Sequence, residues 1–172
     1  RAARSTTTAA GPSAGIEGGL LAGKERRGFG LVHFSVMGNH LHFIVEAEDR
    51  TSLSRGMQGL LVRIAKRLNL AMMRKGKVFA DRFHSRMLGT TLDVRNTLIY
   101  VLNNARRHGI AFEGTFDPYS SAAWFHGWRD DVERPHRESP VASPRTWQLK
   151  SGFLLHGRLN PNEVPGWRTR IA

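Results

Sequence analysis

Two runs of β-branched and aromatic residues, separated by a Gly-Asn pair, constrain the fold of this chain most. Residues 31–37 and 40–46 both have the composition of a strand. The intervening Gly38 and Asn39 are residue types that favour tight turns. The sequence therefore predicts an antiparallel hairpin, with His40 and His42 on its second strand.

Helical periodicity follows the hairpin twice. Between residues 53 and 72 apolar side chains recur every three or four positions, with Thr51 or Ser52 as the expected N-cap and Gly76 as the expected stop. Residues 77–88 favour a strand or an extended segment. A second helix is expected over 92–108, capped by Thr91 and ended by Gly109.

These elements indicate an α+β fold in which an antiparallel sheet is backed by helices. A length of 172 residues suits one domain. We expect a disordered or divergent N-terminal arm over 1–19, with a short helix near 20–26 opening the 20–110 domain. The 111–172 extension is irregular, rich in Pro and Trp, and expected to pack on the domain or on DNA.

Charge and composition narrow the function. The chain has no Cys, which excludes disulfides, Cys-ligated zinc and iron–sulfur clusters, and no run of apolar residues long enough to span a membrane. Its net charge is +12, and residues 50–109 hold 13 Lys and Arg against two acidic residues. Such a basic segment favours a nucleic acid partner over a merely solvated surface. The expected DNA-contacting residues are Arg55, Arg63, Lys66, Arg67, Arg74, Lys75, Lys77, Arg82, Arg86 and Arg107.

The pair His40 and His42 is the first chemical motif. Alternate residues of a strand point to the same face, so both imidazoles leave one face while Leu41 and Phe43 point to the opposite one. Two neutral imidazoles can share a divalent metal. By itself, a His-x-His pair on a strand more often has a structural role or lies on the surface than binds a metal.

Tyr100 is the second motif. It lies about 140° from the centre of the apolar face of its helix, on a polar face with Asn96, Asn104 and Arg107. Spacing alone favours an ordinary surface tyrosine. Beside a metal, however, a tyrosine can attack a phosphodiester. A third metal ligand could come from Asn104.

Two other residues are alternatives for that third ligand. Glu46 lies farther along the face of the strand that carries His42, and His84 lies in the extended segment.

The motifs resemble those of one family. Residues 36–45, VMGNHLHFIV, resemble the VMPNHxHLLV signature of single-tyrosine HUH transposases, especially the REP-associated tyrosine transposase branch. Residues 79–86, FADRFHSR, resemble its GRFxSR segment, and residues 98–107, LIYVLNNARR, its tyrosine helix. Residues 117–122, DPYSSA, are similar to a short following region.

The resemblance implies a ferredoxin-like or RRM-like HUH domain that binds Mg²⁺ or Mn²⁺ and transfers strands of single-stranded or hairpin DNA. Carried over, His40, His42 and Asn104 are metal ligands, and Tyr100 is the nucleophile that forms a 5′-phosphotyrosine. A monomer or homodimer in the bacterial cytoplasm, associated with the nucleoid, is expected.

This sequence departs from the family pattern at its start. Members begin with a strand that lies beside the His-x-His strand, and nothing in residues 1–19 has that character. We expect the sheet to have an unpaired edge there. A catalytically inactive, hairpin-binding remnant of the family is therefore the alternative function.

Two further functions are weaker. Phe34 and Phe43 could stack RNA bases as in RNA-recognition modules, but neither lies in an RNP-like string. A zinc hydrolase is disfavoured because the chain lacks an HExxH-type helix.

Overall fold

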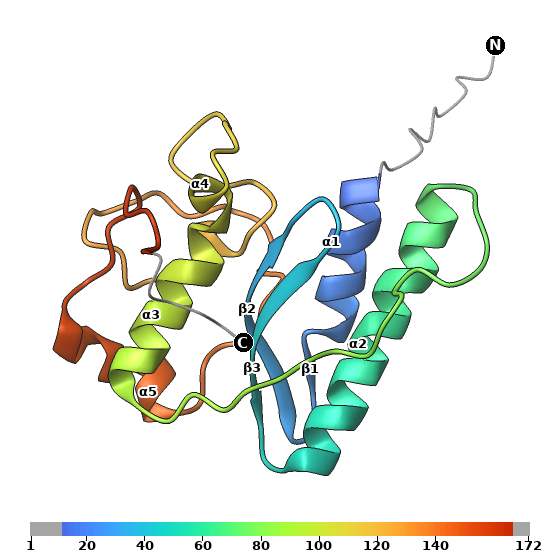
Figure 1. Cartoon of the computed structure of the whole chain (residues 1–172), viewed down its shortest axis with the longest axis horizontal. Coiled ribbons are helices and arrows are strands. Elements are labelled where there is room, and N and C mark those ends of the chain that lie inside the picture. Colours follow the sequence, from blue (N-terminus) through green and yellow to red (C-terminus); the bar gives the residue numbers. More distant parts are fainter. Residues whose placement is uncertain (1–11, 167–172) are drawn as a thin grey trace.

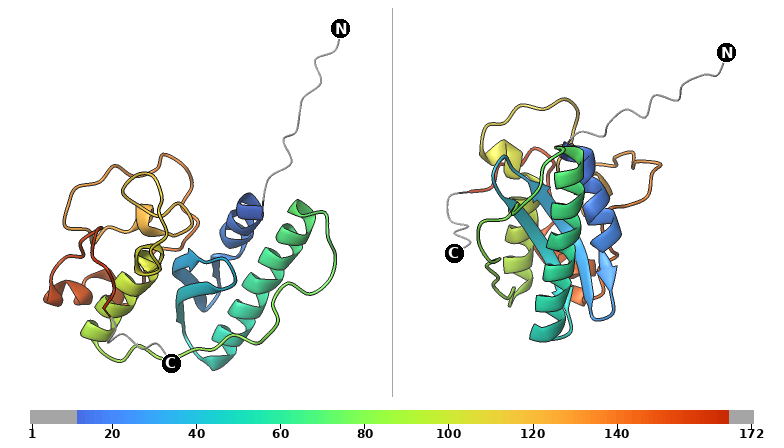
Figure 2. Two further views of the ribbon diagram at one scale, coloured as in Figure 1. Left: turned by 45° about the horizontal axis from the view of Figure 1, so that its top comes forward. Right: turned by 90° about the vertical axis from the view of Figure 1, so that its right-hand side faces the viewer.

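The computed structural model describes residues 12–166 and confirms an α+β fold. A three-stranded antiparallel sheet of β1 (Glu25–Arg26), β2 (Phe29–Val36) and β3 (Leu41–Ala47) stands in the middle of the molecule, in the order β1-β2-β3. Helices α1 and α2 cover one face of the sheet, and α3 covers the other (Figures 1 and 2). The sheet is thus buried between two helical layers.

The predicted hairpin is present and antiparallel. Its strands begin and end within two residues of the expected limits, and Val36 pairs with Leu41 while Ser35 pairs with His42. The amide of Met37 donates to the carbonyl of His40 and closes the turn. This register fixes which side chains of β3 face α3.

Two helices form the layer on one face of the sheet. α1 (Pro12–Gly23) packs along α2 (Arg50–Ala71). The arm expected over 1–19 is therefore wrong from Pro12 onward, and the short helix expected at 20–26 ends at Gly23, where β1 follows. Residues 1–11 lie outside the described residues. The buried side chains of this layer come from α1, α2, β2 and the extension: Leu20, Phe29, Leu31, Phe34, Met57, Leu60, Ile64 and Val141.

The N-cap of α2 differs from the expected one. Asp49, rather than Thr51 or Ser52, caps the helix, because its Oδ1 accepts a hydrogen bond from the amide of Ser52 at 2.6 Å. The helix ends at Ala71, before Gly76. The exposed cations Lys66 and Arg67 lie on the C-terminal half of the helix, and Arg74, Lys75 and Lys77 follow it in the next segment.

Of the two alternatives for residues 77–88, a strand or an extended segment, the strand does not form. This stretch has no regular secondary structure. Phe79 packs against the α1–α2 layer and Leu88 against the opposite one. The segment therefore links the two layers instead of extending the sheet.

The second predicted helix is interrupted. α3 (Thr91–Leu102) is capped by Thr90, and a break at Asn103 separates it from α4 (Asn104–Arg107). Asn103 donates to the carbonyls of Asn160 and Glu163. The C-terminal extension therefore holds the helix at its break.

The C-terminal extension encloses α3 and completes the sheet. It contains η1 (Ala122–Trp124), α5 (Trp147–Lys150) and η2 (Gly152–His156). Trp128, in the same layer as α3, is buried; Trp147 is 57% exposed, and Trp167 lies outside the described residues.

The two edges of the sheet differ in whether the chain covers them. The amide of Val36 donates to Tyr119, and the amides of Ser121 and Ala142 donate to Phe34 and Leu31, so the extension closes the β2 edge beyond β1. Within residues 12–166 no strand pairs with the outer side of β3.

No helix within residues 12–166 is both long and apolar enough to cross a membrane.

Candidate functional site

The two histidines of the hairpin lie together at the start of β3. His40 is exposed and directly precedes the strand, and His42 is half-buried on the face toward α3. Their ring centroids are 4.8 Å apart, with the rings nearly perpendicular. Leu41 and Phe43 pack on the opposite face, against the α1–α2 layer. The period-two alternation of a strand therefore separates the imidazoles from the core on that side.

Tyr100 meets this pair from the other layer. Its half-buried ring lies edge-on to the ring of His42, with centroids 5.2 Å apart. The guanidinium of Arg107 sits 5.0 Å from the centroid of the Tyr100 ring. A phenol, two imidazoles and a cation thus converge from β3, α3 and α4.

Asn104 lies at the first position of α4, four residues after Tyr100. It is fully buried, yet within the described residues neither its Oδ1 nor its Nδ2 has a hydrogen-bond partner. Nε2 of His42 is also buried without a partner. Buried polar groups are almost always satisfied in folded proteins. Unsatisfied nitrogen and oxygen donors of this kind suit a divalent cation.

The protonation state of His42 is set by its surroundings. Burial, together with the nearby imidazoles of His40 and His108, lowers its pKa from 6.5 to about 4. The ring is therefore neutral at physiological pH, which is the form that can donate a lone pair to a metal.

His108 is a site residue that the sequence reasoning missed. It caps the C-terminal end of α4, and its ring centroid lies 6.5 Å from that of His40. The helical period could not have identified it, because a position eight residues after Tyr100 lies about 80° from its face and the helix is interrupted at Asn103.

Both alternatives for the third ligand are elsewhere. The Glu46 carboxylate accepts hydrogen bonds from the amides of Arg145 and Thr146, at 2.7 and 2.8 Å, and from the Thr146 hydroxyl. It therefore anchors the start of α5. His84 lies in the exposed segment between α2 and α3. Across residues 12–166, no three His, Cys, Asp or Glu side chains are grouped to hold a metal.

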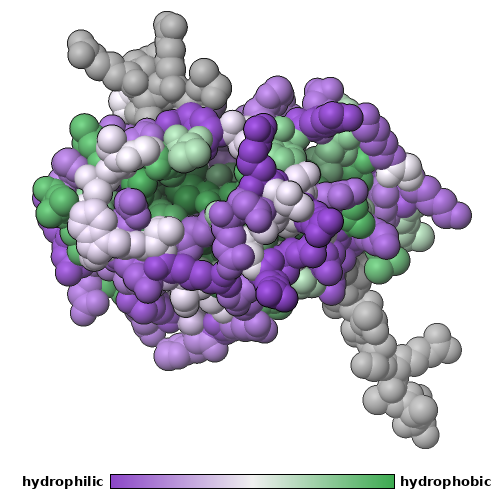
Figure 3. Space-filling model, turned by 90° about the horizontal axis from the view of Figure 1, so that it is seen from below, coloured by the Kyte–Doolittle hydropathy of each residue, from purple (hydrophilic) through white to green (hydrophobic). Residues whose placement is uncertain are grey.

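Most of the predicted DNA-contacting residues are exposed along α2 and the segment after it. Eight of these are exposed and form no ion pair within the described residues: Arg55, Arg63, Lys66, Arg67, Arg74, Lys75, Lys77 and Arg82. The underside of the molecule is correspondingly hydrophilic around a hydrophobic hollow (Figure 3).

Two of the predicted contacts have structural roles. Arg86 binds Asp93 through two hydrogen bonds of 2.8 Å and contacts Thr97. Arg107 is placed over Tyr100. The predicted contacts that remain available for phosphates are therefore the exposed cations that form no ion pair within the described residues.

The aromatic pair proposed for RNA stacking is unavailable. Phe34 is 5% exposed, and Phe43, paired with it across the hairpin, packs on the same covered face. Because α1 and α2 lie over this face, it offers no open platform on which successive RNA bases could stack on Phe34 and Phe43.

Comparison with models of protein families, with curated proteins and with solved structures gives no match to this chain.

Proposed function

We propose that this chain is a metal-dependent strand transferase that acts on single-stranded or hairpin DNA, with Tyr100 as its nucleophile. The observation that carries the proposal is the contact of the Tyr100 ring with that of His42, whose centroids are 5.2 Å apart, beside the paired ring of His40. The buried side chain of Asn104, four residues after Tyr100, has polar atoms without a partner among the described residues. The resemblance of residues 36–45, 79–86 and 98–107 to REP-associated tyrosine transposases gives these residues the same roles.

The metal ligands are His40, His42 and Asn104. Neutral imidazoles and an amide oxygen accept Mg²⁺ or Mn²⁺. When bound, such a cation would neutralise the charge that develops on a phosphodiester. Asn104 is favoured as third ligand because Glu46 is held by Thr146 and His84 lies in the exposed segment.

The chemical step forms one bond to phosphorus and breaks another. The Tyr100 oxygen attacks the phosphodiester, the phenol loses its proton, and the 3′ oxygen leaves and is protonated. A 5′-phosphotyrosine and a free 3′-hydroxyl result. In the second transfer, a 3′-hydroxyl attacks the phosphotyrosine and Tyr100 regains a proton. The guanidinium of Arg107, 5.0 Å from the centroid of the Tyr100 ring, places a cation beside the attacking group, where it can contact the phosphate.

A single chain suffices for this site. Tyr100, His42 and Arg107 contact one another within one molecule. A monomer is therefore the proposed active unit, acting on nucleoid DNA in the bacterial cytoplasm. The exposed cations of α2 and the segment after it would bind the phosphates of a hairpin stem.

Loss of transfer on removing one imidazole tests the metal assignment. We expect His42→Ala to abolish Mn²⁺-dependent joining of labelled single-stranded DNA, and the matched change His84→Ala to leave it within about twofold, because His84 is exposed and lies away from the cluster. Equal activity of both variants would remove His42 from the site.

The second candidate is a hairpin-binding protein that no longer cuts. It is favoured by the sheet order β1-β2-β3, in which no strand within residues 12–166 pairs with the outer side of β3, where the family's first strand is expected. In this case His42→Ala leaves hairpin affinity unchanged, and the parent chain forms no covalent adduct in Mn²⁺.

A further inference from the structure

A second site lies on the opposite side of the hairpin from the histidine cluster. A cavity of about 220 Å³ opens between α1, β2 and the C-terminal extension. Its lining includes Phe34 and Val36, whose side chains face the α1–α2 layer. His42 pairs with Ser35, the residue between Phe34 and Val36, and its side chain faces α3 instead. The cavity is therefore separate from the site that holds Tyr100.

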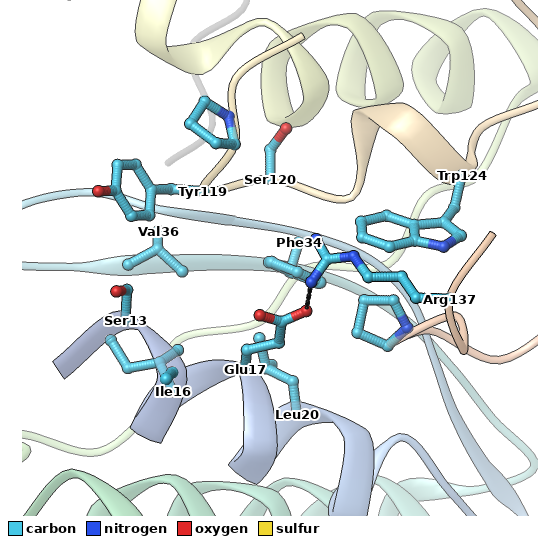
Figure 4. A pocket seen from close by; sticks show the side chains of 13 residues that line it. Ser13, Ile16, Glu17, Leu20, Phe34, Val36, Tyr119, Ser120, Trp124 and Arg137 are labelled. Carbon is cyan, nitrogen blue, oxygen red and sulfur yellow. Dashed lines mark hydrogen bonds and ion pairs between the residues drawn. The ribbon is translucent and has the colours of Figure 1, made fainter. Parts of the chain in front are cut away.

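Aromatic side chains form much of the wall. Tyr119 and Trp124 stand at opposite ends of the cavity, and Phe34 lies between and behind them (Figure 4). Tyr119 is 54% exposed although its backbone is held by β2. A concave, largely apolar site with a few polar groups at its rim is the usual form of a small-ligand pocket.

The polar groups of the cavity are an ion pair and a hydroxyl. The Arg137 guanidinium pairs with the Glu17 carboxylate and sits 5.0 Å from the centroid of the Trp124 ring. Figure 4 shows this pair in front of Phe34, with Ser13 near Tyr119. The site thus offers flat apolar surfaces, a stacked cation, and both donors and acceptors of hydrogen bonds.

We propose that this cavity holds one unstacked nucleobase of the single-stranded DNA on which the chain acts, a proposal that rests on the proposed function. A base is planar, stacks on aromatic and guanidinium faces, and presents donors and acceptors at its edge. A net charge of +12 draws the rest of the strand to the same molecule.

The spacing of the two sites is compatible with one strand. Val36 lines the cavity, and His40 follows it by four residues. Four extended residues span at most about 14 Å, so the Cα atoms of Val36 and His40 lie within that distance. A strand passing the Met37–His40 turn can therefore place one base in the cavity and a phosphate near His40 a few nucleotides away.

An aromatic side chain of a partner protein is the competing occupant. The site favours the base because its rim combines a cation and a carboxylate, which match the mixed donor and acceptor edge of a base. A phenyl ring has no donor or acceptor to meet the Arg137–Glu17 pair, and an indole ring has a single donor, so neither matches both charges of the rim.

The test measures binding without requiring cleavage. The full chain in EDTA, with Tyr100→Phe to prevent reaction, is mixed with each of the four deoxyribotrinucleotides made of one base, and magnetisation transfer from protein to base protons is recorded by NMR. Ala14→Trp, which places an indole on the exposed α1 residue that lines the cavity, should reduce the transfer roughly fivefold or more for the preferred base. Ala22→Trp, on the exposed part of α1 outside the cavity, is the matched control. Tyr119→Ala, which removes one stacking wall, should also weaken the transfer.

Four results overturn the proposal: no transfer to any trinucleotide, undiminished transfer with Ala14→Trp, equal loss with Ala22→Trp, or a stronger signal from N-acetyltryptophanamide than from every trinucleotide. Because the readout needs neither metal nor Tyr100, base binding without covalent chemistry would refute only the proposed transferase. Covalent chemistry without base binding would refute only this cavity.

Discussion

His33 and His42 are two imidazoles that the fold keeps neutral on neighbouring strands. His33 is buried, with Nδ1 3.1 Å from the Ser121 hydroxyl, and burial with a nearby His126 lowers its pKa to about 3. His42 is less buried and its pKa falls to about 4. His33 bonds to the extension and stabilises the fold, whereas the Nε2 of His42 is left free to bind a ligand.

Acid should destabilise the chain through these residues. The unfolded imidazoles bind protons below pH 6.5, whereas folded His33 stays neutral to about pH 3, so the free energy of unfolding falls as pH falls through this range. Each such group contributes a slope of about 1.4 kcal/mol per pH unit. We measure the free energy of unfolding by urea between pH 4 and 6 and plot it against pH. In His33→Gln the slope of this plot should correspond to about one proton fewer taken up on unfolding than in the parent chain. An unchanged slope would mean that His33 is protonated in the folded chain.

Arg82 and Arg86 belong to the same basic segment but should behave differently. Arg82 is exposed without an ion pair, so Arg82→Ala should lower the slope of log affinity for single-stranded DNA against log salt by about 0.7. Arg86 is held by Asp93 and Thr97, so Arg86→Ala should instead cost about 1 kcal/mol of stability. Fluorescence anisotropy across a salt series and urea unfolding separate the two effects; identical behaviour would contradict the contacts.

Single residues could be predicted only where a local period governs them. The strand alternation placed His40 and His42 apart from Leu41 and Phe43, and the helical period placed Tyr100 on a polar face. The partners of Glu46 come from residues about a hundred positions away, and no local pattern encodes them. The role of His108 depends on how α4 leaves the break at Asn103.

At the scale of elements, α1 and α2 pack closely along each other. A Cβ on Gly19 would lie 2.6 Å from the Ile64 Cα, so the helix backbones touch. A Cβ on Gly18 would meet only the flexible end of Arg67 at 2.9 Å. The two adjacent glycines therefore offer a matched comparison.

Gly19→Ala should destabilise the chain by about 1–3 kcal/mol because the helices must separate. Gly18→Ala should be neutral or stabilising by up to about 1 kcal/mol, since alanine favours the helix and Arg67 can move. Thermal unfolding of the two variants measures the difference. Equal loss in both would show that α1 does not pack closely against α2.

Elements with strong periodicity were predictable, and those shaped by distant contacts were not. The hairpin and both long helices follow from their patterns. The helix breaks at Asn103, which bonds to Asn160 and Glu163. The local pattern could not decide between a strand and an extended segment over 77–88, because Phe79 and Leu88 pack on opposite layers. Helix α1 was not predicted because its many glycines suggested a loose arm. In the structure these glycines allow α1 to pack closely against α2.

For the whole molecule, the C-terminal extension decides the architecture. It closes the β2 edge, packs Trp128 and Phe153 against α3, and binds Glu163 to Arg95. Within residues 12–166, the unpaired edge expected from the sequence is thus only the outer side of β3. The fold class followed from the sequence, but this closure could not, because the extension has almost no periodic structure of its own.

Covalent capture tests the central claim most directly. The chain contains only two tyrosines, so Tyr100→Phe and the control Tyr119→Phe together account for every phenol. With labelled hairpin-bearing single-stranded DNA and Mn²⁺, the parent and Tyr119→Phe should give an adduct that survives denaturing electrophoresis. EDTA or Tyr100→Phe should abolish it. An adduct that persists in Tyr100→Phe, or no adduct from the parent despite tight hairpin binding, would contradict the assignment of Tyr100 as the nucleophile.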